Sequence, residues 1–152
     1  MLPLWRKVLV VKGTMIQAVL VLVVAATMTG CNEQPESHYP TVAAAAQAGG
    51  FEHGWLPAVL NPDVTDIREW HDLDTNEVRG QFALNDPVLH RLQSDCKQAT
   101  DVPRHIRSAP SWWPDSIERG ELVSSRAAFR CGDFFVAVNT SNRAGYFWAN
   151  SR

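Results

Sequence analysis

The first thirty residues most constrain what this chain can fold into. They carry Arg6, Lys7 and Lys12 without an acid, and an apolar run follows over 18–26. A run of that length spans about 14 Å as a helix, against about 30 Å of bilayer hydrocarbon, so a permanent membrane span is the weaker interpretation. A basic start followed by a short apolar run is typical of a secretory signal. We therefore expect residues 1–30 to be a leader and only the rest of the chain to fold.

The leader ends in Met28-Thr29-Gly30-Cys31, which resembles a bacterial lipobox. The resemblance implies cleavage before Cys31, a diacylglyceryl thioether on its sulfur, and acylation of the new amino group, for example by palmitate. Three acyl chains exceed the two signals that stable attachment needs, so the chain would be an envelope lipoprotein with the membrane as its partner. Asn32 stands where inner-membrane retention favours Asp, which implies the periplasmic face of the outer membrane in a Gram-negative cell. The alternative is a plain signal peptide with an incidental cysteine.

Cys96 and Cys131 make an even pair if Cys31 is lipidated, because the chain has three cysteines. Disulfides persist in an oxidising compartment. A bridge between the two would close a loop of about 35 residues, for which the chain-entropy model gives roughly 3.8 kcal/mol. Two separate buried thiols are the alternative. The sequence contains no C-x-x-C or Cys/His cluster that would indicate a zinc site.

Composition indicates an ordinary globular domain. The chain has 152 residues, of which 45% are hydrophobic and 20% charged. A formal net charge of −2 gives no basic field, so we expect no nucleic-acid partner. The polar, proline-containing stretch 31–40 is predicted to be the lipidated cysteine and a short tether. Residues 41–152 are then a single domain.

The patterning predicts an α+β fold, with an antiparallel sheet of about five strands and two or three helices packed on one side. Thr41 can cap a helix over 42–48, and Asp86 with Pro87 can open another. A short helix is predicted at 114–119. The segment 97–125 contains three prolines and is otherwise hard to assign. The strands are predicted at 65–72, 77–84, 126–131, 134–139 and 144–148.

The second predicted strand has the clearest alternation. Val78, Phe82 and Leu84 alternate with polar or small residues, among them Arg79. A period of two with polar partners predicts one buried and one wet face. Arg79 is therefore expected to face water.

The densest polar cluster surrounds the turn between the first two predicted strands and includes His71, Asp72, Asp74 and Asn76. The D-x-D-x-N spacing is typical of the opening of a calcium loop. A full EF-hand is excluded, because the sixth position lacks Gly and the twelfth lacks Glu. A partial calcium site on Asp72, Asp74 and Asn76 stays open. The simpler interpretation is a hairpin turn whose side chains bond to neighbouring backbone N–H groups.

Complete catalytic sets are missing from the sequence. His71 with Asp72 or Asp74 could form half a triad, but there is no G-x-S-x-G elbow, H-E-x-x-H pair or phosphate loop. We therefore expect a non-enzymatic protein, with a hydrolase that uses His71 as an alternative. The Trp112-Trp113-Pro114 run favours core packing over an exposed aromatic patch for a partner.

Three segments carry a further resemblance: 51–60 (FEHGWLPAVL), 65–77 (TDIREWHDLDTNE) and 80–82 (GQF). They are similar to the YbbD head domain family of small, often lipid-anchored bacterial proteins, over about residues 41–84. The resemblance brings no activity or ligand, but it draws attention to the run from His71 to Asn76. The leading hypothesis is a non-enzymatic envelope lipoprotein that acts through an envelope protein partner or a ligand. The alternative is a divalent-metal or small-ligand binder at that run.

Overall fold

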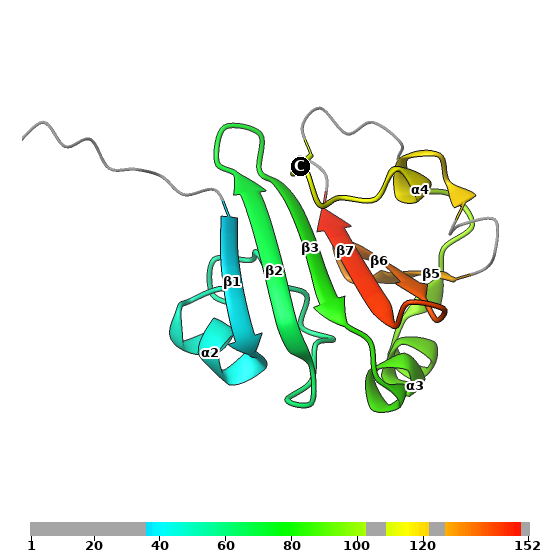
Figure 1. The fold of residues 1–152 in the computed structure, drawn as a ribbon, viewed down its shortest axis with the longest axis horizontal. Coiled ribbons are helices and arrows are strands. Elements are labelled where there is room, and N and C mark those ends of the chain that lie inside the picture. Colours follow the sequence, from blue (N-terminus) through cyan, green and yellow to red (C-terminus); the bar gives the residue numbers. More distant parts are fainter. Residues whose placement is uncertain (1–35, 103–108, 122–126, 150–152) are drawn as a thin grey trace, which may run out of the picture. The chain divides into compact units, whose positions relative to one another are not determined.

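One antiparallel sheet with the strand order β1-β2-β3-β7-β6-β5-β4 organises the described part of the chain (Figure 1). The computed structural model describes residues 36–102, 109–121 and 127–149. Within those ranges, no helix is both long and apolar enough to cross a membrane. The strands are β1 (Glu36–Thr41), β2 (Thr65–Asp72), β3 (Glu77–Ala83), β4 (Lys97–Gln98), β5 (Ala128–Cys131), β6 (Phe134–Asn139) and β7 (Ala144–Ala149).

The predicted α+β class is confirmed, but the sheet has seven strands where about five were expected. One addition is β1, which forms from residues that the sequence assigned to the tether. It pairs with β2 along the edge of the sheet, where Pro40 is tolerated because an edge strand can leave one side unpaired. The other addition is the two-residue β4, which lies in the segment that was hard to assign and pairs with β5.

The helices are α2 (Val42–Gln47), α3 (Asp86–Asp95) and the one-turn α4 (Asp115–Glu118). The Thr41 side chain accepts a hydrogen bond from the backbone N–H of Ala44 and caps α2, as predicted. The prediction for α3 is wrong by one residue. Asn85, rather than Asp86, accepts from the N–H of Val88, which leaves Asp86 in the first turn next to the positive end of the helix.

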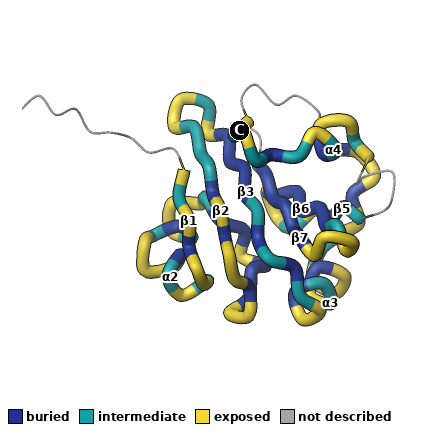
Figure 2. The backbone as a smooth tube through the Cα atoms, viewed as in Figure 1, coloured by how far each residue is buried: buried dark blue, intermediate teal, exposed yellow. Residues whose placement is uncertain are grey.

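Alternate residues of β6 and β7 enter two separate hydrophobic cores. Val136 and Phe147 belong to the first core, and Phe135 and Trp148 to the second. Because side chains alternate along a strand, these cores lie on opposite faces of the sheet. Figure 2 shows the resulting continuous burial of both strands.

Helices cover both faces, so the prediction of helices on one side is wrong. The first core receives Ala45 from α2 and Val88 and Leu92 from α3. The second core receives Ile117 of α4 and residues that lead to it, among them Trp113. Described residues between α3 and β5, among them Ala99, Val102 and Ile117, thus cover the second face. The predicted core packing is confirmed for Trp113, which is 6% exposed, whereas Trp112 is half-buried and donates to Glu36.

The predicted bridge between Cys96 and Cys131 is present. Cys96 ends α3, and Cys131 is the last residue of β5. The bridge therefore ties the first-face helix α3 to a strand near the far edge of the sheet, across 35 positions of sequence.

Removal of this bridge in a Cys96→Ser, Cys131→Ser variant is expected to lower the free energy of unfolding by about 4 kcal/mol, because the unfolded chain regains the entropy of the open loop. Urea unfolding followed by circular dichroism measures the change. A Ser94→Ala variant, which alters an exposed residue on the same helix, is the matched control. Equal unfolding free energies for the bridged and unbridged proteins would contradict the prediction.

Two reciprocal glycine–phenylalanine contacts join β3 to β7. Gly80 pairs with Phe147, and Phe82 pairs with Gly145. A Cβ atom on Gly80 would overlap the Phe147 ring, and one on Gly145 would overlap the Phe82 ring. Each ring therefore lies over the bare backbone of the opposite glycine, which packs both rings flat against the first face.

Gly80→Ala is expected to lower the free energy of unfolding by about 1–3 kcal/mol, because the added methyl group must displace the buried Phe147 ring. Urea unfolding measures this loss, and Gln81→Ala, at the neighbouring half-buried position, is the control. A Gly80→Ala protein as stable as the wild type would show that the ring can move freely.

Candidate functional site

A hollow of about 330 Å³ opens beside the hairpin that joins β2 to β3. Its lining includes the rings of His53, Trp55, His71 and Phe134, together with Val78. Residues 72, 73 and 76 of the hairpin turn complete one side. The volume lies at the lower end of the range of about 300–1,000 Å³ that small-ligand sites occupy. This pocket is the candidate functional site.

Three stacked rings form one wall of the pocket. The His71 ring lies 3.8 Å from the Trp55 ring, centroid to centroid, at an interplanar angle of 9°. The other face of Trp55 is covered by His53, at 4.5 Å and 28°. Because both faces of the indole are occupied, a ligand would meet its edge or the outer imidazoles rather than a free aromatic face.

A buried carboxyl group lies behind this wall. Glu69 is 0% exposed, and its Oε1 lies 2.9 Å from Nδ1 of His71. Within the described part of the chain, its Oε2 has no hydrogen-bond partner. Burial raises the pKa of Glu69 from 4.5 to about 8, because a charged carboxylate loses its hydration there. The carboxyl is therefore mainly neutral at pH 7, and it fixes the orientation of the His71 ring.

The local sequence explains why Glu69 and His71 meet. Ile67, Glu69 and His71 alternate along β2 and so point to the same face of the sheet. Glu69 lies opposite Ser37 of β1, a small residue that leaves room for a carboxyl group, and opposite Gly80 of β3, which the Phe147 ring covers. The strand thus carries a polar pair on its buried face, which explains its poor hydrophobic alternation.

The predicted site residues separate into two groups. His71, Asp72 and Asn76 line the pocket, whereas Asp74 is not among its lining residues. Oδ1 of Asp72 accepts from the backbone N–H groups of Asp74 and Thr75, at 2.9 and 3.2 Å. These are the bonds that the simpler hairpin-turn interpretation predicts. Asn76, with a φ of 56°, completes the turn.

The described residues show no group of three or more His, Cys, Asp or Glu side chains placed to hold a metal ion. The calcium site on Asp72, Asp74 and Asn76 stays a prediction. Coordination of calcium by Asp72 would compete with the hydrogen bonds of the turn, since Oδ1 of Asp72 already accepts two backbone bonds.

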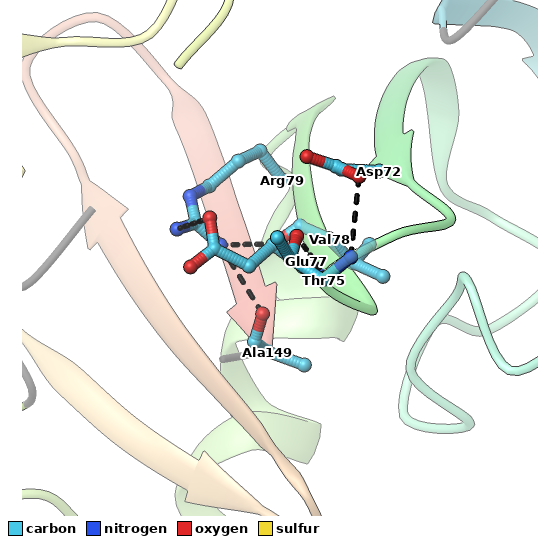
Figure 3. A network of polar contacts seen from close by, with 6 residues as sticks. All are labelled: Asp72, Thr75, Glu77, Val78, Arg79 and Ala149. Carbon is cyan, nitrogen blue, oxygen red and sulfur yellow. Dashed lines mark hydrogen bonds and ion pairs between the residues drawn. The ribbon is translucent and has the colours of Figure 1, made fainter. Parts of the chain in front are cut away.

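The opposite face of the same hairpin carries a buried ion pair (Figure 3). Nη1 of Arg79 donates to the carbonyl oxygens of Val78 and Ala149, and Nη2 lies 3.3 Å from Oε2 of Glu77. Burial lowers the pKa of Arg79, whereas the negative charge of Glu77 acts in the other direction and raises it. The expectation that Arg79 faces water is wrong: it is 0% exposed, with its guanidinium 5.9 Å from the ring of Trp113 in the second core.

Sequence reasoning placed His71 in the site but missed its real partners. It paired His71 with Asp72 or Asp74, which are close in sequence, whereas the structure pairs it with Glu69 on the same face of β2. A period-two pattern that includes a carboxylate and an imidazole is the signal that could have found this pair. The family resemblance includes Trp55, but no local pattern indicates its contact with His71, because that contact spans the connection between α2 and β2.

The pocket lining contains imidazole, indole, amide and carboxylate groups. The described lining residues include no Ser, Thr, Cys or Lys, so imidazoles and carboxylates are its reactive groups. A hydrolase with a hydroxyl or thiol nucleophile would need such a group within hydrogen-bond reach of His71.

The architecture is that of a two-faced α+β sheet domain with a pocket at one end of the sheet. Residues 33–83 match the model of the YbbD head domain, which confirms the resemblance for this segment. No curated protein and no solved structure matches the sequence. The matched segment ends with β3 and contains His53, Trp55, Glu69 and His71. The opposite side of the pocket, with Phe134, comes from outside it.

Replacement of the buried acid by its neutral isostere, Glu69→Gln, is expected to change how stability depends on pH. The folded pKa of Glu69, about 8, is above its ordinary value of 4.5. The contribution of Glu69 to the free energy of unfolding is thus fully present below pH 4.5. This contribution is lost as pH rises towards 8, at up to about 1.4 kcal/mol per pH unit.

Urea unfolding of both proteins at pH 5, 7 and 9 measures this difference. The Glu69→Gln protein should gain stability over the wild type as pH rises, and the gain should level off above pH 8. A constant difference across this range would show that Glu69 ionises in the folded protein as it does in water.

Proposed function

We propose that this chain is a non-enzymatic binding module, anchored by lipid at Cys31 to the bacterial envelope, and that the pocket beside the β2–β3 hairpin is its ligand site. The observation that carries the proposal is the position of the pocket at the end of the sheet where β1 begins. The lipobox-like leader supplies the anchor, and the proposed location is the periplasmic face of the outer membrane.

Strand register supports this placement. Glu36, the first residue of β1, pairs with Trp70, which is adjacent to His71 of the pocket. Cys31 precedes Glu36 by five residues. Five residues span at most about 18 Å in any conformation. An anchor on Cys31 would therefore keep the pocket close to the bilayer surface, so its ligand would be a molecule or envelope protein segment presented near the membrane.

The disulfide supports an extracytoplasmic location. Bridges such as Cys96–Cys131 persist in oxidising compartments and are rare in the reducing cytoplasm. Secretion by the leader would deliver the chain to such a compartment.

The pocket supports binding as the activity. Its wall of stacked rings is preorganised by the His71–Glu69 contact, and a preformed site of apolar walls with a few polar groups is typical of ligand recognition. A hydrolase with a hydroxyl, thiol or amine nucleophile is not favoured, since the described lining includes no Ser, Thr, Cys or Lys.

Fractionation of a Gram-negative host that expresses the full chain tests the proposal. The wild-type protein is expected in the membrane fraction, with mass spectrometry showing cleavage before Cys31 and acyl groups on it. Cys31→Ala should abolish acylation and leave the leader uncleaved at this site.

Asn32→Asp is the matched control, because it keeps the cysteine and should keep acylation. A wild-type protein that is soluble, with Cys31 unmodified, would overturn the proposal.

A further inference from the structure

Glu69 is the least satisfied polar group near the pocket. Its side chain is completely buried, its Oε1 is 2.9 Å from His71 Nδ1, and its Oε2 has no hydrogen-bond partner among the described residues. A buried ionised carboxylate with one unpaired oxygen is costly, so its surroundings favour the neutral acid or access to water.

The pocket loop, residues 49–56, is connected to Glu69 through the ring of His71. Trp55 stacks on His71, and His53 stacks on Trp55. The loop is held to itself by backbone bonds that return to its start, from His53 to Gly49 and from Trp55 and Leu56 to Gly50. Gly50 also donates to the carbonyl of Ala45 in α2, and Leu56, which is 3% exposed, belongs to the first core. The base of the loop is therefore anchored, and the ring stack links its tip, residues 53–55, to the polar face of β2.

We propose that Glu69 is the positioning residue of the pocket and acts as a pH-dependent latch: its neutral carboxyl holds the His71 ring against Trp55 and keeps the pocket loop closed, and its ionisation favours opening. The latch rests on the proposed function in one respect, namely that this pocket is the ligand site. It adds a means by which the pocket wall responds to the pH of the envelope.

Few other ionisable groups face Glu69. The residues opposite it, Ser37 on β1 and Gly80 on β3, carry none, and His71 is its neighbour on the same face of β2. The loop contributes His53, stacked on the far side of Trp55.

The charged groups of the hairpin lie further along the sheet. Asp72 and Glu77 pair with each other in the next register position, and both are lining residues of the pocket. Along their strands they alternate with the inward-facing His71 and Val78, and Glu77 is paired with Arg79. His71 and His53 are therefore the groups whose titration must be separated from that of Glu69.

The direction of the latch follows from linkage. Burial raises the pKa of Glu69 to about 8 in the closed state, and contact with water in an open state would return it towards 4.5. Opening then releases a proton, so it becomes easier as pH rises and levels off above about 8. The equilibrium changes by at most tenfold per pH unit. The Glu69→Gln variant keeps both imidazoles and therefore separates the titration of Glu69 from theirs.

Amide hydrogen exchange of the full chain in detergent, followed by mass spectrometry, tests the latch between pH 6.5 and 9. Protection factors, corrected for the intrinsic pH dependence of exchange, are compared for the loop 49–56 and the β6–β7 turn 140–143. In the wild type, loop protection should fall by up to tenfold per pH unit as far as pH 8 and then level off, while the turn stays constant. In Glu69→Gln, loop protection should not depend on pH.

Glu52→Gln, at an exposed acid of the same loop, is the matched control and should keep the wild-type profile. A flat wild-type profile, or a Glu69→Gln profile that still follows pH, overturns the latch. The proton shift of His71 Cε1–H in the wild type gives a second readout that needs no variant: an inflection near pH 8 is expected, and its absence also overturns the latch.

These outcomes are independent of the anchoring experiment. Loop exchange does not report whether Cys31 is acylated, so a failed latch leaves the proposed lipoprotein standing. An unacylated, soluble protein with a pH-dependent loop would instead overturn the proposed function and keep the latch.

Discussion

The pairing of β3 with β7 holds the two halves of the sheet together. These strands lie far apart in sequence, and their contact joins the N-terminal strands to the C-terminal hairpins in one sheet. The contact is close because Gly80 and Gly145 accept the rings of Phe147 and Phe82 over bare backbone. Aromatic rings over strand glycines also determine the register, since a slip of one residue would place a side chain where each ring now lies.

The same pairing explains why the sheet is buried on two faces. It places Arg79 beside Trp148, on the side opposite to the glycine–phenylalanine contacts. A guanidinium in that position needs acceptors, which the carbonyls of Val78 and Ala149 and the carboxylate of Glu77 provide. The aromatic residues after α3 then cover it. A buried ion pair of this kind is weak evidence for stability, but loss of either partner would leave an uncompensated charge.

The pocket combines rigid and adjustable parts. Its floor belongs to the ends of strands, whereas the Trp55 wall comes from a loop that joins β2 through a ring stack. Glu69 is the chemical link between them, since its state governs how firmly the His71 ring is held. The match to the YbbD head domain covers this wall, and β6 and β7, outside the match, complete the pocket. The proposed binding role would explain why polar groups are retained on a buried strand face.

Local chemistry made several features predictable from the residues: the α+β class, most of the helix and strand positions and the turn at Asp72. Cysteine parity favoured the Cys96–Cys131 bridge over two separate thiols. The burial of Arg79 and Glu69, the strand at 36–41 and the stacking of Trp55 on His71 depend on contacts between distant segments. The periodicity of hydrophobic residues shows which way a side chain points on its own helix or strand. What covers that face depends on segments distant in sequence, whose contacts no local pattern records.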